Sequence, residues 1–335
     1  MRAVEIENPD KARPLVTRVH EVALPEGAVN NGEVRETNTV TSAIRKLWSE
    51  GGFKSKRVIL GIGNQRVIAR DLTMPKLPSL MQIREALPFQ VQELLPVPVN
   101  EALLDFYPIS EGEGENGPVV NGLLIAAIKD AVLTNVKAVK DAGLIPVSVD
   151  LIPFALSRAL VRGPMASAVV AIVDIGASTM NVVVTDGGVP QFVRMIPVGG
   201  DDISRALGSR LEIPPAQAES LKVARGLSTA PPTSEVEMQS MEIIRATSHE
   251  LLNSLRNTLT YYINQHPTAP PQAIVIAGGG SRLVGLAQAL SEMTRLQVVS
   301  ANAFSTLDVS KALQKSNNNL DSMTIALGLA LGHAA

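Results

Sequence analysis

The residues around Asp174 combine the side-chain types that bind phosphate. An apolar run ends at Asp174, a tight turn begins at Gly176, and Ser178 and Thr179 precede the next apolar run. Glycine lets the backbone bring N–H groups near an anion, hydroxyls add donors, and a carboxylate at a strand end can hold Mg²⁺ through water. The pattern predicts a phosphate-binding turn that also includes Ala177, with Asp174 as the metal-binding residue. This segment alone leaves open the alternative of a plain β-hairpin with an exposed aspartate.

A second segment that could bind part of a phosphate-containing ligand has three consecutive glycines, Gly278, Gly279 and Gly280, between an apolar run and a predicted helix. Bare backbone leaves room for the sugar or phosphate of a ligand near a helix N-terminus. Three glycines in a compact crossover cost chain entropy, which favours ligand contact over the alternative of a loose connector.

A third glycine segment lies between these two. Gly199 and Gly200 follow an apolar run and precede a predicted helix, so they offer another stretch of bare backbone to a ligand. Asp201 or Asp202 is the candidate N-cap of that helix, and capping alone would also explain the pattern.

Glu219 and Lys222 stand three positions apart in the next predicted helix, so their side chains lie on one helix face. A solvated ion pair is the ordinary explanation of this spacing, and contact with the hydroxyls of a ribose is the more specific one. The pair on its own does not decide between them.

The elements expected in the second half of the chain alternate strands with helices. Apolar runs predict the strands, two of which are joined at 186–188 by the hairpin signal Asp-Gly-Gly, and helical periodicity predicts the helices. The expected strands are 168–173, 180–185, 191–198, 273–277 and 296–299, and the expected helices are 201–211, 215–225, 236–265, 283–293 and 322–331.

The first half of the chain has the same mixture. We expect a hairpin formed by 57–61 and 66–72, and a solvated hairpin tip over the acidic segment 111–118. The other expected strands are 1–7, 14–24, 103–109, 119–128 and 147–149, and the expected helices are 39–50, 81–95, 129–142 and 151–161. The alternation predicts an α/β protein whose layers form two lobes.

Composition excludes several classes of protein. The net charge of −2 lacks the basic field expected of a protein that binds nucleic acid. The absence of cysteine excludes disulfides, thiolate zinc sites and cysteine nucleophiles, and the four histidines are not spaced as metal ligands. Neither a membrane-spanning run nor a signal-peptide run occurs, so we expect a cytoplasmic protein.

The order of these motifs resembles that of the actin-like nucleotide-binding superfamily. The chain as a whole resembles one of its families, the PilM proteins of type IV pilus assembly, which are relatives of FtsA. The resemblance covers nearly the full length, and its middle segments distinguish the PilM family from sugar kinases and heat-shock chaperones. Outside the glycine segments, it rests on residues 83–86, 93–101, 104–107, 142–150, 255–262 and 326–330.

The resemblance implies an actin-like, two-lobed α/β fold with a small inserted α+β subdomain and a cleft for ATP and Mg²⁺. The first lobe would be 1–78 plus 148–165, the insert 79–147, and the second lobe 166–335, with its helical subdomain at 201–269. The turn after Asp174 would be the second phosphate loop, the three glycines at 278–280 the adenosine loop, and Glu219 and Lys222 would lie on the helix that contacts ribose.

The resemblance also implies a scaffold function. PilM-like proteins bind the N-terminal cytoplasmic tail of a PilN-like membrane protein, in the groove between the insert and the first lobe, and so link the inner-membrane complex to the pilus motor ATPase. The protein would lie at the inner face of the cytoplasmic membrane, reaching the membrane only through partners. The alternatives are an active ATPase or small-molecule kinase and a filament-forming protein. No acidic residue has a sequence position that marks it as a general base, so we expect at most a slow ATPase.

One departure from the superfamily pattern concerns the first phosphate loop. The superfamily uses two loops of strand–Asp-Ile-Gly–strand design, and this chain contains one. Residues 1–6 are similar to 180–185, the second strand of such a hairpin, so the printed chain begins where a first loop would have finished. A start site placed too far downstream, a truncation or a true loss would each give this pattern. With a true loss, an inner strand and half of the phosphate cage would be missing, and ATP binding would be weaker.

Overall fold

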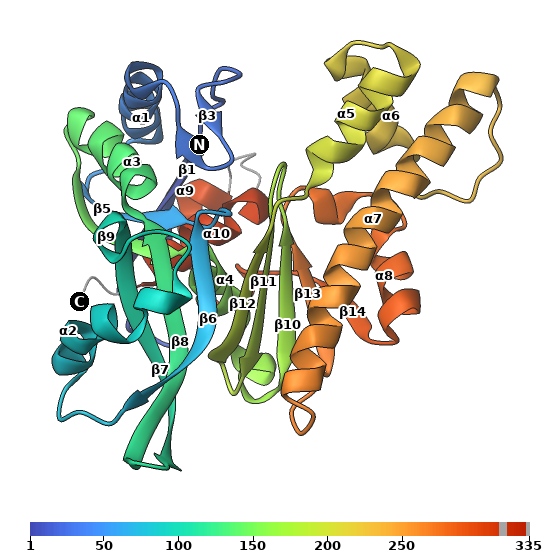
Figure 1. Ribbon diagram of the computed structural model, residues 1–335. Helices are drawn as coiled ribbons and strands as arrows, with labels where there is room; N and C mark the ends of the chain where they lie inside the picture. Colours follow the sequence, from blue (N-terminus) through green and yellow to red (C-terminus); the bar gives the residue numbers. More distant parts are fainter. Residues whose placement is uncertain (315–319, 333–335) are drawn as a thin grey trace.

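The computed structural model describes residues 1–314 and 320–332, and Figure 1 shows two groups of sheets and helices side by side. The second half of the chain forms a five-stranded sheet with its helices, and the first half forms several smaller sheets. Residues 315–319 and 333–335, which fall in the predicted second lobe, lie outside the described residues. Strands and helices alternate along the chain, so the predicted α/β class is confirmed.

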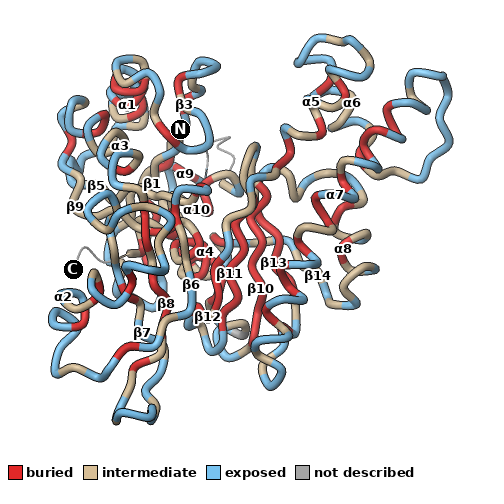
Figure 2. The backbone as a smooth tube through the Cα atoms, in the orientation of Figure 1, coloured by how far each residue is buried: buried red, intermediate tan, exposed pale blue. Residues whose placement is uncertain are grey.

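The five-stranded sheet has the strand order β12-β11-β10-β13-β14. β10 is antiparallel to β11 and parallel to β13. Every residue of β10 is buried because helices cover both faces of the sheet, α4 on one and α7 on the other (Figure 2). The bounds are β10 (Val170–Ile175), β11 (Met180–Asp186), β12 (Val189–Ile196), β13 (Ala273–Ala277), β14 (Gln297–Ser300), α4 (Ile152–Leu160) and α7 (Glu235–Gln265).

Helices α5 (Gly200–Leu211) and α6 (Pro215–Arg225) project beyond one end of this sheet together with the first turns of α7 (Figure 1). A small core that includes Ile203, Leu207 and Ile244 holds these three helices together. α8 (Leu286–Thr294) packs on the same face of the sheet as α7. None of the helices in the described residues is long and apolar enough to span a membrane.

The first half of the chain forms most of two short sheets that do not pair with each other, and the C-terminal segment adds one strand and one helix to them. One has the order β1-β2-β15 and the other consists of the parallel pair β5 and β9. Helices α1 and α3 cover one side, where they form a core with β5, and α10 packs against β1 and β5. The bounds are β1 (Arg2–Glu7), β2 (Leu15–Glu21), β15 (Asp308–Val309), β5 (Arg57–Ile62), β9 (Ile145–Leu151), α1 (Thr37–Gly51), α3 (Lys129–Asp141) and α10 (Thr324–Ala330).

A separate antiparallel sheet with the order β6-β8-β7 forms the lower part of the first half (Figure 1). Helix α2 (Leu80–Gln90) packs on it through Ile83 and Leu87. The bounds of the strands are β6 (Val67–Pro75), β7 (Ala102–Gly114) and β8 (Gly117–Ile128). The division at 79 and 147 stays a prediction; in the structure this sheet also contains β6, and α3 packs against α1.

The remaining described elements are short. The chain also contains the paired strands β3 (Val29–Asn30) and β4 (Glu33–Val34), and the helix α9 (Lys311–Gln314). Single 3₁₀ turns lie at Gln92–Leu94, Val99–Glu101, Gly163–Ser167, Gly280–Arg282 and Leu320–Met323.

Two sequence predictions about this half are corrected by the structure. The strands at 57–61 and 66–72 form, but they do not pair as a hairpin, because β5 pairs with β9 and β6 pairs with β8. The acidic segment 111–118 is a hairpin tip as expected, but pairing between β7 and β8 continues through it as far as Gly114 and Gly117. The unpaired tip is therefore shorter than predicted.

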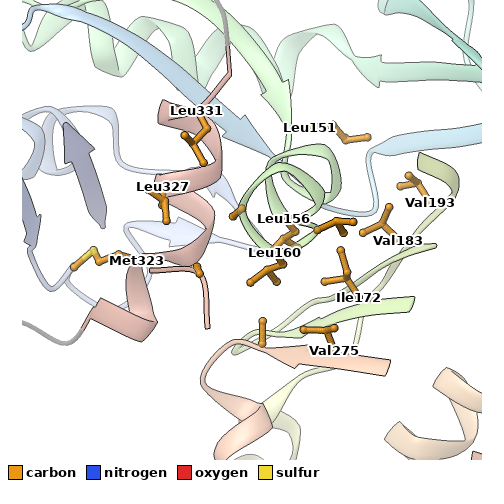
Figure 3. Packing of buried hydrophobic residues seen from close by; sticks show 14 of the residues in the cluster. Leu151, Leu156, Leu160, Ile172, Val183, Val193, Val275, Met323, Leu327 and Leu331 are labelled. Carbon is orange, nitrogen blue, oxygen red and sulfur yellow. The ribbon is translucent and has the colours of Figure 1, made fainter. Parts of the chain in front are cut away.

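One hydrophobic core joins the two halves of the molecule. It contains Leu156 of α4 and Leu327 of α10 together with Ile172, Val183 and other side chains of the five-stranded sheet (Figure 3). Helices α4 and α10 approach closely, since a Cβ on Gly328 would lie 1.9 Å from the Ala155 carbonyl oxygen. The two halves therefore share buried surface and are not independent units.

Candidate functional site

The turn after Asp174 and the three glycines after β13 lie side by side. β10 and β13 are parallel neighbours, so both segments leave the sheet at the same edge. A Cβ on Gly278 would lie 2.4 Å from the Ile175 carbonyl oxygen and 2.7 Å from Asp174 Oδ1, and Gly278 has φ +82°. Any other residue at 278 would clash and be strained, so glycine is required for this close approach.

Gly199 and Gly200 join the same cluster. The Gly200 N–H donates to the Gly176 carbonyl oxygen at 2.9 Å, and the Asp201 N–H donates to the Ala177 carbonyl oxygen at 2.8 Å. A Cβ on Gly199 would lie 2.2 Å from that same oxygen of Ala177. Backbone contacts of this kind leave no room for side chains between the two segments.

The third glycine segment, residues 278–280, lies against the other two. A Cβ on Gly200 would lie 3.8 Å from the Cα of Gly280, whereas a Cβ on Gly279 would meet nothing within 4 Å. Three glycine segments that are far apart in the sequence therefore meet at one edge of the sheet, and Gly279 faces open space there. Bare backbone next to such space is what a phosphate or sugar needs to approach closely.

Glu219 and Lys222 of α6 bind each other and the glycine cluster. Lys222 Nζ lies 2.7 Å from Glu219 Oε2 and donates to the Gly200 carbonyl oxygen at 3.2 Å. Ser204 Oγ donates to the same carboxylate at 2.6 Å. Partial burial raises the pKa of Glu219, but the hydrogen bonds from Lys222 and Ser204 and the charge of Lys222 outweigh it, so the pKa lies below its usual value.

Asp174 is almost completely buried, with 4 % of its surface exposed. Burial raises the pKa of this carboxyl to about 6, and a hydrogen bond from Asn181 Nδ2 to Oδ2, 3.2 Å long, opposes the shift. Asn181 Oδ1 is buried without a hydrogen-bond partner, and a Cβ on Gly63 would lie 3.1 Å from it. The alternative of an exposed aspartate is therefore wrong, and the end of β5 abuts this site.

The side chains around Asp174 offer a cation only part of the ligands that it needs. The Asp174 carboxylate and the unpaired Asn181 amide oxygen are hard oxygen donors of the kind that Mg²⁺ prefers. No group of three or more His, Cys, Asp or Glu side chains that could hold a metal occurs in residues 1–314 and 320–332. A metal here would need water or ligand oxygens for the rest of its coordination, as Mg²⁺ bound with a nucleotide does.

Two details of the predicted site are corrected. The helix predicted at 283–293 begins three residues later, because Gly280–Arg282 is a single 3₁₀ turn and α8 starts at Leu286. The N-cap of α5 is Gly199 and not Asp201 or Asp202; Asp202 Oδ2 instead accepts from the Gly199 N–H at 2.7 Å, from inside the first turn.

The sequence reasoning missed three neighbours of the site, Gly63, Asn181 and Ser204. Gly63 follows a strand just as Gly176 does, and the run Gly61-Ile-Gly63 was a usable signal for a close backbone approach. Asn181 and Ser204 carried no such signal, because each is an ordinary polar residue within a strand or a helix.

Comparison with solved structures agrees with this arrangement. A PilM-PilN type IV pilus biogenesis complex contains a chain that superposes with a TM-score of 0.82 at 26 % identity, covering 98 % of this chain and 94 % of that one. MreB5 of Spiroplasma citri bound to AMPPNP superposes with a TM-score of 0.51 at 11 % identity, covering 92 % and 78 %. These neighbours establish an actin-like fold, as predicted.

The chain is also similar to curated proteins. FtsA of Escherichia coli K12 is 28 % identical over 227 residues, which are 57 % of this chain and 53 % of FtsA. FtsA of Bacillus subtilis 168 is 22 % identical over 244 residues, which are 66 % and 55 %. The alignments span about half the length of these relatives. A family model described as type IV pilus assembly protein PilM matches residues 1–334, so the chain belongs to the PilM family, as the sequence motifs predicted.

Proposed function

We propose that the protein is a nucleotide-binding scaffold of a type IV pilus inner-membrane assembly complex. The observation that carries this proposal is the meeting of three glycine segments with Lys222 at one sheet edge, in a chain of the PilM family. The cofactors are ATP and Mg²⁺, and the partner is the N-terminal cytoplasmic tail of a PilN-like membrane protein. The protein would sit at the inner face of the cytoplasmic membrane through this partner, with the pilus motor ATPase as a further contact.

We assign residues of the chain to the phosphate, nucleoside and metal of a bound nucleotide as follows. The backbone N–H groups of 176–179 and the hydroxyls of Ser178 and Thr179 would bind phosphate oxygens. The open space beside Gly279 would take the nucleoside, with Glu219 and Lys222 near its ribose. Asp174 would hold Mg²⁺ through water, and the metal would neutralise phosphate charge.

The carboxylates around the site favour binding over rapid hydrolysis. Asp202 caps α5 through the Gly199 N–H, and Glu219 is paired with Lys222, so neither is free to act as a general base. Asp174 is buried against Asn181. We therefore favour a nucleotide-dependent scaffold, with at most slow ATP hydrolysis, over a kinase.

A protein partner is supported by the apolar surface of the insert. Leu80, Met81 and Phe89 of α2 are 50 %, 70 % and 83 % exposed. A hollow at the C-terminal end of α2 is lined by Pro88 and Phe89 and by the following Pro-Val-Pro segment. Phe89, the most exposed of the three, borders this hollow, and an apolar surface of this kind is what a protein partner would cover.

The nucleotide part of the proposal is tested with Gly279→Ala. The added methyl group meets no protein atom, so we expect unchanged stability, but it enters the space given to the nucleoside. Affinity for ATP with Mg²⁺, measured by calorimetry, should fall at least about tenfold, which corresponds to about 1.4 kcal/mol. Gly208→Ala in α5, whose Cβ would meet the Ile213 carbonyl oxygen at an ordinary 3.4 Å, is the matched control and should bind normally. Equal ATP affinity of both variants would contradict the assignment.

The partner part is tested with a synthetic peptide of a PilN-like cytoplasmic tail. Calorimetry should detect binding to the wild-type protein, and Phe89→Ser should weaken it at least about fivefold because an exposed anchor is lost. Val223→Ser, which removes a side chain of α6 that is 63 % exposed, is the matched control. Absence of peptide binding at high micromolar concentration, with and without ATP and Mg²⁺, would count against the scaffold function.

A further inference from the structure

One end of the first half of the chain gathers the ends of four elements, α1, α3, β5 and β9, which lie together in Figure 1. The Arg45 guanidinium of α1 donates to the carbonyl oxygen of Asp141, the last residue of α3, at 2.6 Å. Arg57, the first residue of β5, pairs with Ile145, the first residue of β9. The Ile145 N–H also donates to the Lys56 carbonyl oxygen at 2.8 Å. The C-terminal parts of both helices and the starts of both strands therefore lie next to each other.

The side chains at this end are mostly basic. Two carboxylates, Glu50 and Asp141, are present; Glu50 Oε1 lies 3.9 Å from Lys46 Nζ, and Asp141 Oδ2 lies 2.6 Å from Lys137 Nζ. Within the described residues, the other five cations have no carboxylate partner. We call this surface the basic end and define it by its seven cations, all of them exposed: Arg45, Lys46, Lys54, Lys56, Arg57, Lys137 and Lys140.

The neighbouring strand β1 does not cancel this charge. The Glu5 carboxylate accepts from the N–H groups of Lys54 and Ser55 at 3.1 and 3.0 Å and forms an ion pair with Arg18. Partial burial raises the pKa of Glu5, but the hydrogen bonds from Ser55, Arg18 and Lys54 outweigh it, so the pKa lies below its usual value. The turn that follows β1 carries as many cations as carboxylates: Glu7 and Asp10, Lys11 and Arg13.

The basic end is separate from the candidate nucleotide site. β5 runs from Arg57 at the basic end to Ile62, and Gly63, which follows, abuts Asn181 beside Asp174. Six residues of a β-strand span about 20 Å. The cations at the start of β5 are therefore too far from the glycine segments to bind a phosphate there, and they need another explanation.

Exposed apolar side chains accompany the cations. Ile145 is 55 % exposed although it begins a β-strand. Leu133 of α3 is 47 % exposed and precedes Lys137 and Lys140 by four and seven positions, so these three side chains share one face of the helix. Basic side chains with apolar ones among them suit an anionic membrane, where the cations bind headgroups and the apolar groups enter the interface.

We propose that the basic end lies directly on an anionic membrane surface and binds the headgroups of its lipids. The choice of a membrane rests on the function proposed above, which places the chain at the inner face of the cytoplasmic membrane. The whole chain has a net charge of −2, so the residues outside the basic end are on balance acidic and are not attracted to such a surface. The partner would attach the protein to the membrane, and the basic end would determine which side of the protein faces it.

The test uses the full chain without nucleotide or partner peptide, so that its result depends on neither. The probes are vesicles of phosphatidylcholine and vesicles of phosphatidylcholine mixed with anionic phosphatidylglycerol, and binding is measured by co-sedimentation. We expect binding to the anionic vesicles alone. The protein should be released in about 1 M salt, where the Debye length is about 3 Å.

Lys54→Gln combined with Lys56→Gln removes two cations whose side chains make no hydrogen bond or ion pair in the part of the chain that the structure describes. A cation close to an anionic membrane strengthens binding by about fivefold, so the affinity for anionic vesicles should fall at least about tenfold. Arg245→Gln combined with Arg256→Gln, at exposed positions of α7, changes the net charge equally and is the matched control. Both double variants should bind ATP and the tail peptide as the wild type does.

Three results would overturn the proposal. They are the absence of binding to anionic vesicles, equal weakening by the two double variants, and tighter binding of polyglutamate or duplex DNA than of vesicles at the basic end. The last result would identify the occupant as an acidic polypeptide or a nucleic acid. Because ATP and the tail peptide bind elsewhere, their binding would show in each case whether the function proposed above still holds.

Discussion

The carboxyl of Asp174 gives the protein a pH dependence that can be measured. Its pKa lies at about 6 in the folded protein because of burial, against an ordinary value of 3.8. The folded state therefore binds the proton more tightly than the unfolded state, and this stabilisation is complete below about pH 4 and lost as the pH rises through about 6. Urea unfolding should show stability falling by ~3 kcal/mol over this interval through this group.

Asp174→Asn is the control for this prediction. The amide keeps the shape of the side chain and does not ionise in this pH range. The loss of stability of the variant between pH 4 and 7 should therefore be smaller than that of the wild type by the same amount. Identical pH profiles for the variant and the wild type would show that Asp174 titrates normally and that its burial is not maintained in solution.

At the scale of residues, the sequence predicted which residue types lie together at the site but not which of them are buried. Gly176, Gly200 and Gly280 could be grouped because the order of the glycine segments resembles that of the actin-like superfamily, and the structure brings all three together. The burial of Asp174 and the unpaired oxygen of Asn181 depend on the approach of Gly63 from the first half of the chain. That contact is tertiary: the run Gly61-Ile-Gly63 signals a close backbone approach, but no local pattern shows which residues it approaches.

At the scale of elements, the crossing of α4 and α10 depends on Gly328. A methyl group there would lie 1.9 Å from the Ala155 carbonyl oxygen, so Gly328→Ala must push the helices apart and disturb the shared core. We expect a loss of at least about 2 kcal/mol in urea unfolding, even though alanine is the better helix former. Gly208→Ala in α5 has ordinary contacts and should be neutral or gain up to about 1 kcal/mol. A neutral Gly328→Ala variant would mean that the two helices do not cross this closely.

Strand pairing was the least predictable property of the elements. The turn residues Gly63 and Asn64 between β5 and β6 have the composition of a hairpin, and the strands on both sides formed where expected. Each strand nevertheless pairs with a segment from much later in the chain, β9 or β8. Local turn chemistry predicts that the chain turns, whereas the choice of partner strand depends on which apolar faces the whole fold can bury.

At the scale of the whole molecule, the family-specific segments were more informative than periodicity. The order of the glycine motifs predicted an actin-like fold, and the segments around 83–107 predicted the PilM family, both of which are confirmed. Periodicity alone led no further than an α/β protein with two lobes.

The two halves should unfold together. The core around Leu156 and Leu327 contains side chains of both, so exposing one half exposes the buried face of the other. Trp48 reports on the first half, whereas the far-ultraviolet circular dichroism reports on the helices of both halves, the longest of which is the 31-residue α7 in the second. In urea the two signals should give one midpoint, because a shared core makes unfolding cooperative. A fluorescence transition at clearly lower urea than the loss of helix would show instead that the first half unfolds alone and that the shared core does not couple the two halves.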